Sequence, residues 1–222
     1  MSTRLYWLHT GGRWTWVDLL LITPLVYLGW AAWQDELGVF PLETLLFFSG
    51  HAALILLLLT LGWGSLYGLT RWPVFLTSRK HLGLAAFAWT SLHLLLWLEW
   101  ETGWSLGVIA QLSIDLLYIQ LGWLIWLGLA LLSATSWSWL RQRLTPRSWQ
   151  VIHWLIYPLI ALSLWHYAIV IRLDYTPLHL YTLSLTLLLG LRFWLSGRPQ
   201  SEALGRYNRQ STKANTSNAG SS

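Results

Sequence analysis

Histidine is the residue type in this chain that is best suited to chemistry, and most of its histidines lie in or beside long apolar runs. Six of them do so: His51, His81, His93, His153, His166 and His179. The seventh, His9, lies in the polar N-terminal segment and is expected to be solvated. An ionisable group is costly to bury among apolar side chains, so each of the six marks a candidate functional position.

The composition narrows the chemistry that these histidines can support. The chain has no cysteine, and its single methionine is Met1. This excludes disulfides, iron–sulfur clusters, thiolate metal sites and covalent c-type haem attachment. Neutral imidazole is a good ligand for haem iron, and haem needs a wide apolar slot that aromatic-rich helices can line. The chain has 19 Trp, and we expect those within apolar runs to line such slots (Trp89, Trp123, Trp126, Trp154 and Trp165).

The histidines must be positioned by membrane-spanning helices. Of the 222 residues, 55% are hydrophobic and 10% charged, whereas a soluble domain carries about 25% charge. A helix needs about 20 residues to cross a bilayer, and no run alternates with the period of a strand. The sequence therefore predicts an all-α, polytopic membrane bundle of about six helices, with crossings at Leu19–Trp33, Thr44–Thr70, Leu82–Leu98, Leu116–Leu140, Ser148–Ile171 and Tyr175–Leu191.

The basic residues predict how the bundle is oriented. In a six-crossing arrangement, 13 of the 14 Lys and Arg residues fall on one side and only Arg172 on the other. By the positive-inside rule, both termini are then cytoplasmic. The net charge of +5 is accordingly a topology signal, and binding of nucleic acid is not expected because the basic residues lie at helix ends.

Depth in the membrane singles out one pair of histidines. The third and fifth crossings run parallel, and counting about 1.5 Å per residue places His93 and His166 at similar depth, toward the outer side. His153 lies nearer the cytoplasmic face, 13 residues before His166, which is about 20 Å of rise and suits two stacked haems. His81 is a possible partner for His153, or an interface residue beside Arg79 and Lys80. His51 is positioned to hydrogen-bond a carbonyl or a haem propionate, and His179 to lie at the outer interface.

One feature of this spacing is unfavourable. On an ideal helix, 13 residues leave the side chains of His153 and His166 about 140° apart. Pro158 lies between them, and a proline kinks a helix locally. We expect Pro158 to correct part of this difference in facing.

Three stretches and the six-helix plan around them carry a family resemblance. The stretches are FSGHAAL (Phe48–Leu54), SRKHLGLAAFAWTSLHL (Ser78–Leu94) and RSWQVIHWLIYPLIALSLWHY (Arg147–Tyr167). Together they resemble the ferric-reductase-like transmembrane family, and within it the short branch of haem-binding membrane subunits that serve periplasmic methionine sulfoxide reductases. The resemblance covers about residues 16–195.

The resemblance implies a function and a set of site residues. It implies one or two b-type haems, with FMN also attributed to the family, and haem histidines at His93, His153 and His166. The family's basic pair falls on Arg79 and Lys80. Electrons would come from the quinone pool or a cytoplasmic flavin reductase, and would pass to a periplasmic molybdopterin-dependent reductase that repairs oxidised methionines. The chain would be an electron-transfer subunit in the cell inner membrane rather than the catalytic subunit.

Two departures from the family pattern enlarge the candidate set. His51 follows Gly50, and His81 stands where an apolar residue is expected, so either could be an additional ligand. The candidate cofactor-binding set is therefore His93, His153, His166, His81, Arg79 and Lys80.

The remaining expectations concern domain organisation and alternative functions. Residues 1–15 are expected to be a cytoplasmic segment, 16–195 the haem-binding domain and 196–222 a disordered cytoplasmic tail. No GxGxxG motif precedes a helix, so electrons must come from another protein or a quinol. A ferric-chelate or quinone-linked cytochrome remains an alternative, as does a cofactor-free transporter, although no clear internal repeat is present.

Overall fold

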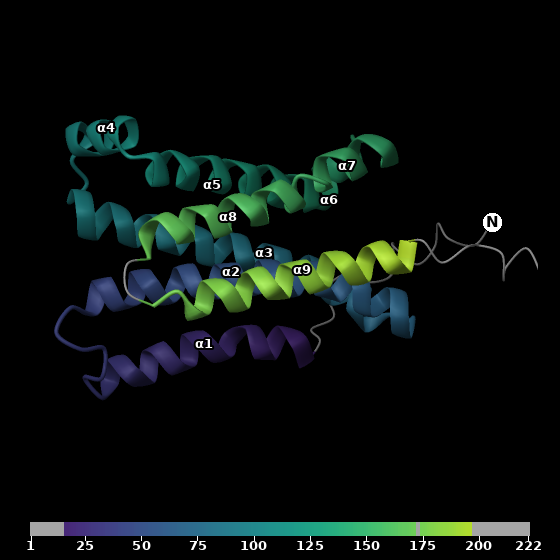
Figure 1. Ribbon diagram of the computed structural model, residues 1–222, viewed down its shortest axis with the longest axis horizontal. Coiled ribbons are helices and arrows are strands. Elements are labelled where there is room, and N and C mark those ends of the chain that lie inside the picture. Colours follow the sequence, from purple (N-terminus) through teal and green to yellow (C-terminus); the bar gives the residue numbers. More distant parts are fainter. Residues whose placement is uncertain (1–15, 172–173, 197–222) are drawn as a thin grey trace, which may run out of the picture.

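The computed structural model describes residues 16–171 and 174–196, and within these ranges the chain forms helices and no strands (Figure 1). Of the two expected terminal segments, 1–15 and all of 196–222 except Ser196 lie outside the described residues, and Ser196 is the last residue of α9. The elements are α1 (Trp16–Trp33), α2 (Pro41–Thr70), α3 (Val74–Trp97), the π-helix η1 (Leu98–Thr102), α4 (Leu106–Asp115), α5 (Leu117–Ser136), α6 (Ser138–Arg141), α7 (Pro146–His153), α8 (Ile156–Val170) and α9 (Thr176–Ser196).

The prediction of an all-helical membrane bundle is confirmed. Five segments of the described chain are long and apolar enough to cross a membrane: Pro41–Thr70, Val74–Thr102, Leu117–Ser136, Pro146–Val170 and Thr176–Leu195. The first predicted crossing corresponds to α1, which has an apolar stretch at Leu21–Trp33. The third crossing is longer than predicted, and α4 is a separate short helix between the third and fourth crossings that the sequence analysis did not assign.

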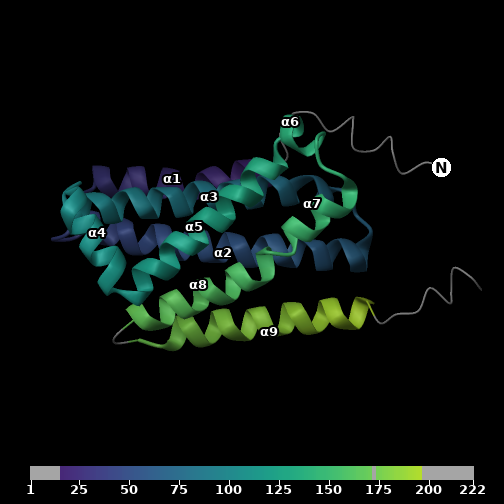
Figure 2. The ribbon, with the colours of Figure 1, turned by 90° about the horizontal axis from the view of Figure 1, so that it is seen from above.

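The long helices run side by side, and α2 lies at the centre of the bundle (Figures 1 and 2). It packs most extensively against α3 and also contacts α8 and α9, while α5 packs against α8 and α3. The most deeply buried large side chains come from three helices and meet here: Leu57 and Leu61 of α2, Leu82 of α3 and Ile160 of α8. Lipid tails are as apolar as leucine, so close van der Waals packing, rather than hydrophobic burial, must hold these helices together.

Small residues allow the closest of these helix contacts. A Cβ added to Gly128 of α5 would lie 2.5 Å from Cδ2 of Leu159 on α8, and Leu159 is itself buried. The glycine therefore sets the separation of α8, which carries His166, from α5, whose Tyr118 carbonyl is hydrogen-bonded to the His166 ring.

The fifth crossing is broken rather than continuous. The turns of α7 end at His153, and α8 begins at Ile156. Pro158 has no N–H, so the carbonyl of Trp154 cannot receive the usual i+4 hydrogen bond; it accepts one from the Tyr157 N–H instead, at 3.2 Å. The break at Trp154 and Leu155 agrees with the hydrogen bond that Pro158 cannot make, and it lies between His153 and His166.

Enlarging Gly128 should destabilise the bundle. A valine there must displace the buried Leu159 side chain, and overpacking of this kind costs about 1–3 kcal/mol. We expect Gly128→Val to lower the free energy of unfolding in detergent by that amount. The matched control is Gly190→Val on α9, where an added Cβ meets nothing within 4 Å. Equal effects of the two substitutions would contradict this account of the contact between α5 and α8.

Candidate cofactor-binding site

His93 of α3 and His166 of α8 face each other across the bundle. Their ring centroids are 6.3 Å apart, and the ring planes are inclined at 83°. The two residues are 73 positions apart in sequence, so the fold alone brings them together. Their proximity agrees with the similar depth expected from counting along two parallel helices.

A backbone carbonyl of a neighbouring helix fixes each ring. Nδ1 of His93 donates to the carbonyl oxygen of Leu46 on α2 at 2.9 Å. Nδ1 of His166 donates to the carbonyl oxygen of Tyr118 on α5 at 2.7 Å. A carbonyl can only accept, so Nδ1 carries the proton in both neutral rings and Nε2 keeps its lone pair. This is the tautomer that binds metal ions through Nε2, with the second ring nitrogen held by a carbonyl.

Glycines lie against both rings. A Cβ on Gly50 would be 3.1 Å from Nδ1 and Cε1 of His93, and one on Gly122 would be 3.5 Å from Cε1 of His166. At Gly50 this is tighter than an ordinary van der Waals contact, and the hydrogen bond to Leu46 prevents the ring from moving away. Gly50 therefore gives the His93 ring the space that it occupies.

The pair suits a metal that brings most of its own ligands. Within the described residues, no cluster of three or more His, Asp, Glu or Cys side chains is placed to hold a metal ion. Two imidazoles that bind one metal from opposite sides, each about 2.0–2.1 Å from it, have ring centroids about 6 Å apart. The observed separation of 6.3 Å fits this arrangement, and a porphyrin supplies the remaining four ligands. The residues present therefore fit a haem held by His93 and His166.

His153 occupies a different environment at the other end of α5. Its ring stacks on Trp149 at 4.0 Å between centroids, and its Nδ1 lies 3.1 Å from the Trp149 carbonyl. Nε2 lies 3.3 Å from the Ser136 hydroxyl at the end of α5. The Nε2 atom that would bind a metal is thus already paired with a hydroxyl, which a ligand would have to displace.

Arg79, Lys80 and His81 lie five to seven residues after the first residue of α3, Val74, and point in different directions. Arg79 is 14 residues before His93, which places it within about 40° of the same helix face, whereas His81, 12 residues before, is turned by about 120°. Arg79 reaches into the bundle, where its charge acts on His153, whereas Lys80 is exposed and His81 is partly buried. The predicted cofactor roles of all three residues stay predictions.

The remaining histidines lie outside the His93–His166 pair. Nδ1 of His51 is hydrogen-bonded to the Tyr181 hydroxyl at 3.0 Å, and the His51 ring meets the Tyr167 ring edge-on at 5.2 Å. His51 therefore joins α2 to α9 beside the pair. His179 is exposed in the first turn of α9, and His9 lies outside the described residues.

Sequence reasoning missed the groups that orient the pair. Carbonyl oxygens carry no sequence signal, so Leu46 and Tyr118 could not have been singled out. Gly50 and Gly122 carry a weak signal, since a glycine inside a helix often marks a close approach, but the sequence does not say what approaches.

Comparison with known proteins places the chain in a family. Residues 49–164, slightly more than half of the chain, match the model of the ferric reductase like transmembrane component family. The chain belongs to this family. The matched segment runs from α2 into α8 and includes His93 and His153, while His166 lies just beyond its end.

Several curated relatives of this family member share one name, the protein-methionine-sulfoxide reductase heme-binding subunit MsrQ. The protein of Xanthomonas campestris (strain 8004) is 36% identical over 187 residues, covering 80% of this chain and 84% of the relative. The protein of Xanthomonas axonopodis (strain 306) is 34% identical over 190 residues, covering 81% of this chain and 85% of the relative. The protein of Polaromonas naphthalenivorans is 29% identical over 196 residues, covering 87% of this chain and 90% of the relative. No solved structure matches the chain.

Proposed function

We propose that this chain is a haem-binding electron-transfer subunit of a methionine sulfoxide reductase system, with His93 and His166 as the axial ligands of one b-type haem. The observation that carries the proposal is the pair itself: two rings 6.3 Å apart, each with Nδ1 bound to a carbonyl of a neighbouring helix. The names of the relatives support the cofactor and the system.

The residues around the pair prepare the site for such a cofactor. A bound haem supplies a centre that takes up and releases one electron at a time. His93 and His166 present unprotonated Nε2 atoms, while the Leu46 and Tyr118 carbonyls hold the rings in orientation. The buried Trp89 lies one turn before His93 and packs with Phe48, with ring centroids 5.8 Å apart. These apolar side chains exclude water from this part of the bundle.

His153 is the candidate ligand for a second haem nearer the other end of the bundle. Its ring is oriented by the Trp149 carbonyl, and binding through Nε2 would replace its contact with Ser136. His81 remains the candidate partner on α3, and the position of Arg79 on the His93 face makes that side of α3 basic near His153. The contacts of His93 and His166 support one haem. A second haem at His153 would require the ligand to displace the Ser136 hydroxyl.

The direction of electron transfer follows from the proposed orientation. With both termini cytoplasmic, the end that carries Arg79, Arg141 and Arg147 faces the cytoplasm, and the His93–His166 pair lies toward the periplasm. We propose a quinol or a cytoplasmic flavin reductase as the electron donor. The proposed acceptor is the periplasmic molybdopterin-dependent catalytic subunit, which reduces methionine sulfoxide in proteins.

Removing either proposed axial ligand should abolish the signal of the haem held by His93 and His166. We expect full-length protein expressed with ample haem to show the absorption bands of a six-coordinate b-type cytochrome, and His93→Ala and His166→Ala each to lose the bands of that haem. His179→Ala is the matched control, because this exposed histidine lies outside the pair and should leave the spectrum unchanged. Purified wild-type protein with no Soret band would contradict the proposal and favour a cofactor-free membrane protein.

Filling the space beside His93 should disturb the same haem without removing a ligand. A side chain at position 50 presses on the ring, which the Leu46 hydrogen bond holds in place. We expect Gly50→Val to reduce haem content and Gly50→Ala to shift the reduction potential measured by spectroscopic titration. Gly29→Val is the control, since an added Cβ at Gly29 meets nothing within 4 Å. Unchanged spectra and potential in both Gly50 variants would argue against His93 as a ligand in the orientation described.

The acceptor can be tested by reoxidation. We expect the reduced protein in vesicles to be reoxidised by the purified methionine sulfoxide reductase catalytic subunit in the presence of a protein methionine sulfoxide, and we expect His93→Ala to abolish this turnover. A ferric chelate is the comparison acceptor. Rapid reoxidation by the chelate together with none by the reductase would favour the ferric-chelate alternative.

A further inference from the structure

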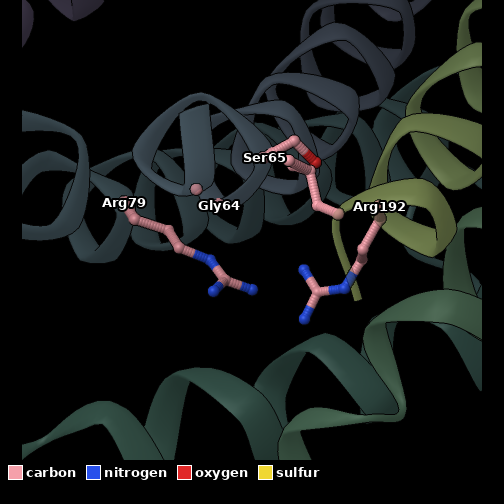
Figure 3. Close-up of a pocket in the computed structure, with 6 residues that line it drawn as sticks. Gly64, Ser65, Arg79 and Arg192 are labelled. Atoms are coloured by element: carbon pink, nitrogen blue, oxygen red, sulfur yellow. The ribbon is translucent and has the colours of Figure 1, made fainter. Parts of the chain in front are cut away.

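A second polar site lies between α2, α3 and α9, at the end of the bundle away from the His93–His166 pair. It is a cavity of about 220 Å³. Figure 3 shows Arg79 of α3 and Arg192 of α9 extending toward one another below Gly64 and Ser65 of α2. The residues that line it, all within the described part of the chain, are Gly64, Ser65, Gly68, Arg79, Arg192 and Leu195.

Two guanidinium groups converge on one point of this cavity. A Cβ built on Gly64 would lie 3.3 Å from Nη1 of Arg192 and 3.4 Å from Nη1 of Arg79. The Arg192 guanidinium also lies over the Tyr157 ring, 5.4 Å from its centroid, which holds it in this direction. Two like charges brought together at the edge of a membrane repel each other, and an anion between them turns that repulsion into attraction.

Ser65 gives an independent indication of a ligand. Its side chain is only 2% exposed, it lines the cavity, and its Oγ has no hydrogen-bond partner. Buried hydroxyls nearly always have a partner, so an orphaned one beside a cavity calls for an explanation. An oxyanion between the two arginines would accept the hydrogen bond that Ser65 can donate.

We propose that this cavity binds the phosphate of an acidic phospholipid headgroup. The three donors come from three helices and approach from different directions, which suits the tetrahedral oxygens of a phosphate better than the planar oxygens of a carboxylate. Guanidinium forks match phosphate geometry, and basic pockets between membrane helices at the cytoplasmic side bind acidic headgroups. A zwitterionic lipid would bring a further cation to the two arginines, so a headgroup with net negative charge is favoured.

The depth of the cavity agrees with a lipid as the source of the phosphate. Gly64 and Gly68 lie within two turns of the last residue of α2, Thr70, and Arg192 lies one turn from the end of α9. This is the level at which headgroups meet a bundle. Leu195 lines the cavity, and the neighbouring Phe193 and Trp194 are exposed, so α9 offers apolar surface beside the phosphate for an acyl chain.

The test compares full-length protein in nanodiscs of phosphatidylcholine with protein in nanodiscs of phosphatidylcholine mixed with phosphatidylglycerol. We expect phosphatidylglycerol to raise the thermal unfolding midpoint and to remain bound in native mass spectrometry. Arg192→Gln should reduce its retention about tenfold, since it removes a charge-assisted hydrogen bond. Arg147→Gln is the control, because it makes the same change in charge at an exposed position at the same end of the bundle.

Ser65→Ala supplies a result that a merely structural role would not give. In phosphatidylcholine alone, it should leave stability unchanged or raise it, because it removes a hydroxyl without a partner. In the mixed nanodiscs, Ser65→Ala should reduce the rise in thermal unfolding midpoint that phosphatidylglycerol gives. The proposal would be overturned if Arg192→Gln and Arg147→Gln reduced the retention of phosphatidylglycerol equally. It would also be overturned if phosphatidylglycerol did not raise the thermal unfolding midpoint of the wild-type protein.

A final arm separates the two sources of phosphate. Inorganic phosphate at millimolar concentration is added to the protein in phosphatidylcholine nanodiscs. No stabilisation by inorganic phosphate supports the lipid headgroup as the ligand. Stabilisation equal to that by phosphatidylglycerol, and lost in Arg192→Gln, would overturn the lipid source and assign the site to a soluble phosphate compound.

Discussion

The requirement that every buried polar group find its partner within the protein determines much of this structure. Water is absent from the bilayer core, so an imidazole there must hydrogen-bond to another helix or bind a ligand. His93 and His166 meet this requirement through carbonyl oxygens of α2 and α5, and Nδ1 of His93 also lies 3.4 Å from the Ser49 hydroxyl of α2. Each bond to a carbonyl joins two helices and also selects the tautomer of the ring. The hydrogen bonds that satisfy the two buried rings therefore also leave Nε2 of each ring unprotonated, which is the state that the proposed haem ligation needs.

The sequence predicts the helices well because their signal is local. A run of apolar residues of sufficient length is a membrane span whatever its neighbours are, and the described helices accordingly overlap all six predicted crossings. The similar depth of His93 and His166 also follows from counting, since both helices start from basic loops on the same side. The break in the fifth crossing could be anticipated from Pro158, although its position at Trp154 and Leu155 required the structure.

What the sequence could not supply is the direction in which side chains face. On an ideal helix, His153 and His166 would point about 140° apart, yet both rings contact α5, one at Ser136 and the other at Tyr118. The break between α7 and α8 lies between these two histidines, and the expected role of Pro158 in correcting their facing stays a prediction. The tryptophans illustrate the opposite outcome. Trp89 is buried as expected for a residue that lines a slot, but Trp154 and Trp165 are exposed on the surface of the bundle. A large apolar ring is as well accommodated by lipid as by a protein core, so its presence within a span does not indicate which way it faces.

Along α3, the depth of a position in the membrane determines whether a neutral or a charged side chain can be accommodated there. His93 and Arg79 lie on nearly the same face of this helix, 14 residues or about 21 Å apart. An imidazole can be neutral, so it can be buried deep in the bundle if one hydrogen bond satisfies its N–H group. A guanidinium remains charged and is costly at the centre of a bilayer, but its long side chain can reach the interface from a helix end. The same face of α3 can therefore present a metal ligand at one depth and an anion-binding cation at another. For this reason, the two sites inferred in this bundle lie at opposite ends of it and differ in the ligands that they suit.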